Sequence, residues 1–233
     1  MTAFRLLAID TATEACSAAL LIDGHLIVRS EIAPRRHAEL ILPMIESLCA
    51  EAGISRRQID GIAVGRGPGA FTGVRLAISV AQGLALGLDV PVVPVSSLAA
   101  LAQDVPSDIE APILAVIDAR MGEVYAGTFR RNRAGLVEPI DAESVGPASG
   151  VVLPPRDDWV VVGSGWSVYR DALVARLPRE PRWADGTRLP QAHAVARLAA
   201  PLFAAGRGVA PEAALPVYLR DKVALTLEEQ RAR

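Results

Sequence analysis

The chain has 233 residues, of which 51% are hydrophobic and 21% are charged, and its formal net charge is −2. This composition is typical of a folded globular protein, and it excludes a disordered chain and a collagen-like repeat. With 24 basic and 26 acidic residues, the chain lacks the cationic excess on which a strongly basic nucleic-acid binder depends.

The first half of the chain alternates predicted strands with predicted helices. Apolar runs and alternating patterns predict strands over 6–10, 16–22, 25–31, 59–64 and 90–95, and helices over 37–52, 72–88 and 96–103. Asp23-Gly24 predicts a hairpin turn between the second and third strands. Pro43 predicts a kink or a second start in the first helix. The polar stretch 104–110 predicts a domain boundary.

The second half repeats this pattern. Residues 113–118 match 6–10, each ahead of a turn and a hairpin. The strand-Gly-x-Gly segment 160–165 matches 62–67, each ahead of a helix. Helices are predicted over 167–177 and 191–205, with no regular element in the Pro/Arg-rich stretch 178–190. We interpret this as an internal duplication, with domains at 1–106 and 107–220 and a charged tail at 221–233. Chance similarity of short apolar strands is the alternative.

An aspartate that ends a first strand, followed by a Thr-containing turn, can hold phosphate through backbone N–H groups and a metal ion through water. Asp10, Thr11 and Thr13 form such a turn, and Asp118 with Arg120 forms its counterpart. In the second turn Arg120 is bulky where phosphate binding favours small residues. These residues therefore predict a vestigial nucleotide site, and a simple turn capped by Asp10 is the alternative.

Other chemical motifs are sparse. The glycine block 65–73 is a poor dinucleotide fingerprint, and no lysine follows it, so it predicts a sharp strand-to-helix turn. The three histidines lack the spacing of a helical metal pair. Cys16 and Cys49 have no C-x-x-C spacing, which argues against a disulfide framework and a thiolate zinc site. We expect no catalytic residue and no metal ligand.

Two predicted helices, 37–52 and 72–88, carry more apolar surface than one face of a sheet can cover. No run reaches the roughly 18 apolar residues of a membrane span, so we expect a cytoplasmic protein with no membrane partner. We interpret the surplus as a protein interface, with burial inside the monomer as the alternative. The predicted interface residues are Leu40, Met44, Phe71, Val74, Arg75, Leu76, Ser79, Val80 and Gly83.

Four segments resemble the TsaB (YeaZ) family. They are 9–13 (I-D-T-A-T), 67–75 (G-P-G-A-F-T-G-V-R), 118–125 (D-A-R-M-G-E-V-Y) and 216–220 (P-V-Y-L-R). The resemblance implies an α/β fold of the actin/Hsp70/sugar-kinase type with two duplicated ribonuclease-H-like halves, the second less regular.

The resemblance also implies a function. It implies a non-catalytic subunit that binds and activates the catalytic paralogue TsaD, together with the ATPase TsaE. The product is N6-threonylcarbamoyladenosine at adenosine 37 of tRNAs reading ANN codons. It implies a homodimer when the chain is alone and indirect contact with tRNA. No cofactor is assigned to this chain alone, and ATP or ADP is expected only in the complex. An active nucleotide-dependent enzyme of the same fold, such as a small-molecule kinase or a carbamoyl-transferring enzyme, is the competing hypothesis.

Overall fold

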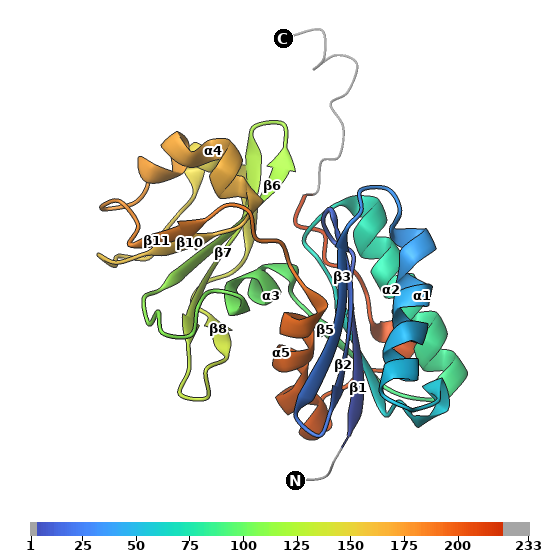
Figure 1. Ribbon diagram of the computed structural model, residues 1–233. Coiled ribbons are helices and arrows are strands. Elements are labelled where there is room, and N and C mark those ends of the chain that lie inside the picture. The colour runs from blue at the N-terminus through green and yellow to red at the C-terminus, as the bar shows by residue number, and fades with distance from the viewer. Residues whose placement is uncertain (1–3, 221–233) are drawn as a thin grey trace, which may run out of the picture.

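Two lobes, each built on one mixed sheet, make up the computed structural model, which describes residues 4–220 (Figure 1). The predicted tail 221–233 lies outside the described residues. The first sheet has the strand order β3-β2-β1-β4-β5. β1 pairs antiparallel with β2 and parallel with β4, so that Leu7 lies opposite both Leu20 and Ile62. The strands are β1 (Arg5–Asp10), β2 (Ala15–Ile22), β3 (His25–Ile32), β4 (Gly61–Gly65) and β5 (Val92–Val95).

The second sheet repeats that topology. Its order β8-β7-β6-β10-β11 corresponds strand for strand to the first sheet. β6 pairs antiparallel with β7 and parallel with β10, as β1 does with β2 and β4. The strands are β6 (Ile113–Arg120), β7 (Glu123–Arg131), β8 (Val137–Pro139), β10 (Val160–Val162) and β11 (Trp183–Asp185), with β9 (Ser144–Pro147) paired to β7. The predicted fold class and the duplication are confirmed.

Helices cover both faces of each sheet. α1 (His37–Glu51) and α2 (Phe71–Leu88) cover the face of the first sheet that points away from the second lobe, as Figure 1 shows. α4 (Ser164–Val174) packs on one face of the second sheet. Short 3₁₀ turns form at Arg56–Gln58, Ala148–Gly150 and Pro211–Ala213.

The last helix of each half packs on the sheet of the other half. α3 (Ser97–Gln103) follows β5 and packs on β6, β7 and β8, whereas α5 (Ala192–Ala204) follows β11 and packs on β1, β2 and β4. Alternate residues of β1 explain the layers, because successive strand side chains point to opposite faces. Leu7 belongs to the core beneath α1 and α2, and Leu6 belongs to the core beneath α5. The two lobes therefore exchange helices.

The two crossovers between the lobes are tied together. Arg188 donates to the carboxylate of Asp104 at 2.8 Å, and His193 Nε2 lies 3.0 Å from the other oxygen of that carboxylate. Burial alone would raise the pKa of Asp104, but the hydrogen bonds from His193 and Arg188 hold it below its ordinary value. This network fixes the end of α3 to the start of α5.

Several local expectations differ from the structure. α1 continues through Pro43 as one helix with no second start there, and Pro43 is exposed. α4 begins at Ser164, three residues earlier than predicted, and β11 lies within the Pro/Arg-rich stretch that predicted no element. α2 is long and apolar enough by composition to cross a membrane, but 33% of its residues are buried in the chain and it packs on the first sheet as a core helix does.

Candidate functional site

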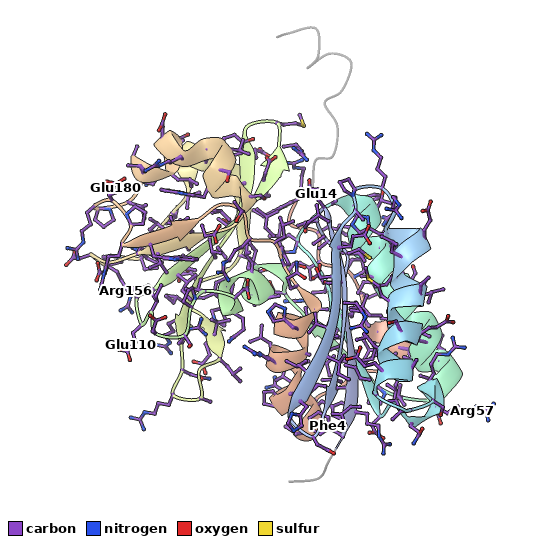
Figure 2. The ribbon with its side chains drawn as sticks, viewed as in Figure 1. Phe4, Glu14, Arg57, Glu110, Arg156 and Glu180 are labelled. Carbon is purple, nitrogen blue, oxygen red and sulfur yellow. The ribbon has the colours of Figure 1, made fainter. Side chains whose placement is uncertain are left out.

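A cavity of about 820 Å³ lies between the lobes and takes its walls from both. The first lobe contributes the β1–β2 turn and the start of α2, and the second lobe contributes the β6–β7 turn and the start of α4. Glu14, which belongs to the β1–β2 turn, lies at the upper end of the first lobe in Figure 2. The residues that line it include Thr13, Glu14, Phe71, Val74, Arg75, Asp118, Arg120, Tyr218 and Arg220.

Asp10 does not reach this cavity. Its side chain is fully buried, one carboxylate oxygen accepts the Ala12 N–H at 2.9 Å, and the other accepts the Ser97 hydroxyl at 3.3 Å. Burial raises the pKa of Asp10 to about 6, while the bonds from Ala12 and Ser97 oppose the rise. Asp10 therefore stabilises the β1–β2 turn from its buried side and does not face the cavity.

The glycine block packs directly on this turn. A Cβ on Gly69 would collide with the carbonyl oxygen of Ala12, and a Cβ on Gly73 would collide with that of Thr11. The Thr11 hydroxyl, also fully buried, donates to the Gly73 carbonyl at 2.7 Å. The block thus allows close approach of the β1–β2 turn to the start of α2, which is the structural reason for its glycines.

The second turn is occupied by its own side chains. The Asp118 carboxylate accepts the Arg120 N–H at 2.8 Å and the Tyr169 hydroxyl at 3.1 Å, and it pairs with the Arg120 guanidinium at 2.9 Å. Tyr169, which supplies this hydroxyl, has a non-helical backbone inside α4. Arg120 also reaches across the cavity to Glu14 at 3.2 Å. This arginine therefore bridges the two turns.

An arginine–aromatic stack stands at the mouth of the cavity. The Arg75 guanidinium lies 3.6 Å from the ring centre of Phe71, and its Nε–H donates to the Tyr218 hydroxyl at 2.6 Å. Phe71 and Tyr218 are themselves 5.8 Å apart between ring centres. A guanidinium over an aromatic face is attractive, so this stack is a defined part of the mouth.

Neither carboxylate of the two turns is free in the space between them. The Asp10 carboxylate of the first turn is buried beneath it, the Asp118 carboxylate of the second turn accepts three donors of its own lobe, and the exposed Arg120–Glu14 pair spans the space between the turns. Of the predicted nucleotide residues, Thr13, Asp118 and Arg120 line the cavity, and Asp10 and Thr11 lie behind it.

Within residues 4–220, no group of three or more His, Cys, Asp or Glu side chains is arranged to hold a metal ion.

The outer face of α1 and α2 is the second candidate site. Across α2, Thr72, Arg75, Ser79 and Gly83 are exposed, and Leu86 is 64% exposed. On α1, Leu42 is 45% exposed, and Leu40 and Met44 are half-buried.

The predicted interface residues do not all lie on that face. Phe71, Arg75, Ser79 and Gly83 are exposed, whereas Leu40, Met44, Leu76 and Val80 are half-buried and Val74 is buried against the chain itself. Sequence reasoning assigned no role to Glu14, Tyr169, Tyr218 or Arg220. For Tyr218 and Arg220 a signal existed, because both lie in the segment 216–220 that carries the family resemblance.

Two duplicated sheets with a cavity between the lobes define a protein of the actin, Hsp70 and sugar-kinase fold class. The profile of the family TsaD, tRNA N6-adenosine threonylcarbamoyltransferase, matches residues 28–224. The tRNA threonylcarbamoyladenosine biosynthesis protein TsaB of Escherichia coli is 43% identical over 230 residues, which cover 94% of this chain and 96% of that protein. The chain belongs to the TsaB family, and so has a role in tRNA threonylcarbamoyladenosine biosynthesis.

Further relatives agree. TsaB of Haemophilus influenzae is 37% identical, with 94% of each chain covered. The solved structure of YeaZ from Pseudomonas aeruginosa is 46% identical and superposes with a TM-score of 0.86 over 93% of this chain and all of that one. A tRNA N6-adenosine threonylcarbamoyltransferase of Trichlorobacter lovleyi is 34% identical over 131 residues, 48% of this chain and 38% of that protein. The resemblance seen in the sequence is confirmed.

Proposed function

We propose that this chain is a non-catalytic subunit in the N6-threonylcarbamoyladenosine modification of adenosine 37 in tRNAs that read ANN codons. It binds and activates a TsaD-like catalytic paralogue, and a TsaE-like ATPase joins the assembly. Alone, the chain pairs with a second copy of itself. Contact with tRNA is made through the other subunits, and the assembly works in the cytoplasm.

The exposed face of α1 and α2 carries this proposal. Apolar side chains that a lone chain leaves in water, such as Leu42 and Leu86, are typical of a protein interface. Ser79 and Gly83 lie one helical turn apart on that face, and a Cβ on Gly83 would meet only open space. Small side chains at this spacing favour close packing of a partner helix along α2.

The arrangement of the cavity supports the non-catalytic part. Arg120 bridges the two turns, and Asp10 is withdrawn beneath the first. These contacts weigh against the competing hypothesis of an active nucleotide-dependent enzyme. Micromolar binding of Mg·ATP to the isolated chain would revive that hypothesis.

A larger side chain at Gly83 tests the partner face. Because nothing of the chain itself lies within 4 Å of a Cβ there, Gly83→Leu leaves the fold intact but blocks close approach of a partner helix. We expect at least about a tenfold loss of affinity for the purified TsaD-like paralogue, equivalent to about 1.4 kcal/mol. Sedimentation of the mixed proteins measures it.

Ala204→Leu is the matched control, because Ala204 is exposed on α5, on the opposite side of the first sheet. It should bind the paralogue as the unmodified chain does. Unchanged affinity of Gly83→Leu, with an unchanged melting temperature, would contradict the proposal.

A further inference from the structure

The chain after α5 first follows the lobe on which α5 packs. Val209 and Val92 exchange backbone hydrogen bonds at the edge of β5, and the Gln82 amide donates to the Ala214 carbonyl at 3.1 Å. Ala214 is fully buried in the core beneath α1 and α2. Up to this point the C-terminal segment is part of the first lobe.

The next residues pass from one lobe to the other. The Val217 N–H donates to the Arg66 carbonyl at 2.9 Å, and Tyr218 joins the stack with Arg75 and Phe71 on the first lobe. Arg220 then donates to the Ala119 carbonyl at 3.0 Å and pairs with the Glu123 carboxylate, both on the second lobe. Four residues thus span the mouth of the cavity, and Figure 1 shows the segment ending between the lobes beside β6.

Arg220 is a stronger link between the lobes than the exposed pair beside it. Its side chain is 20% exposed and has two acceptors, whereas the Arg120 side chain in the Arg120–Glu14 pair is 73% exposed. Water screens the attraction within an exposed ion pair, so that the pair contributes almost no stability. Partial burial and charge-assisted hydrogen bonds make the contacts of Arg220 stronger than that.

We propose that residues 217–220 form a clasp that holds the two lobes at a fixed separation and closes the mouth of the cavity. The crossovers near Asp104 join the two lobes through α3 and α5. The clasp joins the lobes a second time, at the mouth of the cavity. Release of Arg220 from Ala119 and Glu123 frees the mouth, so the lobes separate around the crossovers. This device does not depend on the proposed partner subunits.

Hydrogen exchange of the full chain, followed by mass spectrometry, tests the clasp. Arg220→Gln removes the charge and keeps most of the side-chain volume. We expect about tenfold faster exchange in the β1–β2 turn, the ratio that follows from loss of one partly buried charged hydrogen bond. That turn makes no hydrogen bond with Arg220 among the described contacts, so faster exchange there reports separation of the lobes.

Two further variants make the result decisive. Glu123→Gln removes the partner of Arg220 from the other lobe and should speed exchange of the same turn, which also decides the case if Arg220→Gln fails to fold. Arg133→Gln, at an exposed arginine in the β7–β8 turn, is the control and should exchange as the unmodified chain does. Unmodified exchange of the β1–β2 turn in whichever of Arg220→Gln and Glu123→Gln folds overturns the clasp.

Discussion

Asp10 ends β1 as a fully buried carboxylate whose nearest donors are the Ala12 amide and the Ser97 hydroxyl. Two neutral donors compensate only in part for the hydration that a charged carboxylate loses on burial. The result is a pKa of about 6 in place of the ordinary 3.8. A rise of about two pKa units corresponds to about 3 kcal/mol between the two protonation states.

The raised pKa of Asp10 determines the pH range over which this residue changes the stability of the chain. Because the folded chain holds the Asp10 proton more tightly than the unfolded chain, the stability that protonation contributes is fully present below pH 3.8. It is lost as the pH rises through about 6. Asp10→Asn is uncharged at every pH, so its stability relative to the unmodified chain should rise by about 3 kcal/mol between pH 3.5 and 7. Urea unfolding of both proteins across that range measures the difference.

A difference in unfolding free energy that stays constant with pH would contradict this assignment. A constant offset at all pH values is expected in addition, because an amide cannot accept through both of its terminal atoms.

The position of Asp10 and Asp118 at strand ends could be predicted from the sequence, but their surroundings could not. Which way a carboxylate turns depends on the residues that pack over it, here Ser97 for Asp10 and Tyr169 for Asp118. Both of those residues are distant in the chain. The sequence pattern therefore predicted the positions of the two turns, but it did not show which carboxylate lines the cavity.

At the scale of elements, α2 shows why a helix that is apolar all round resists interpretation. Its inner face, which includes Ala77, Ile78 and Ala81, packs on the first sheet, and its outer face carries Ser79, Gly83 and Leu86. Glycine occurs on both faces for opposite reasons. Gly73 lies against the Thr11 carbonyl, and Gly83 lies in open space.

Alanine at these two positions should have opposite effects on stability. Gly73→Ala forces a methyl group into backbone and should destabilise the chain by about 1–3 kcal/mol. Gly83→Ala adds a methyl group to an exposed helical position and should stabilise it by about 0.5–1 kcal/mol. Chemical denaturation of the two variants measures both changes, and equal shifts in one direction would contradict the packing described for α2.

Long elements were predictable, and three short strands were not, although the equally short β5 and β10 were. β1, β2 and α2 have enough residues to show a period, whereas β8 and β11 have three residues each and β9 has four. Pairing with longer neighbours forms these short strands, and that pairing leaves no local pattern. The continuity of α1 through Pro43 likewise depends on the packing of Ile41 and Ile45 beneath it, which outweighs one lost backbone hydrogen bond.

At the scale of the whole molecule, the exchange of α3 and α5 joins the lobes into one structure. The apolar face of an amphipathic helix predicts that the helix packs on a sheet, but the sequence of the helix does not indicate which sheet. Leu98 and Leu101 of α3 belong to the core formed by Ile113 and Val160 of the second sheet. The predicted division at residues 106 and 107 is therefore crossed by core packing in both directions, and as a domain boundary it stays a prediction.

Truncating one core side chain of the first half should therefore weaken the second lobe. Leu101 is fully buried, so Leu101→Ala should cost about 2–5 kcal/mol. We expect amides of β6 and β10 to exchange faster, because α3 covers the second sheet. Ile78→Ala on α2 is the matched control, since Ile78 is equally part of the first half but packs on the first sheet. That variant should speed exchange of β1 and β4 instead, and the same exchange pattern in both variants would contradict the exchanged helices.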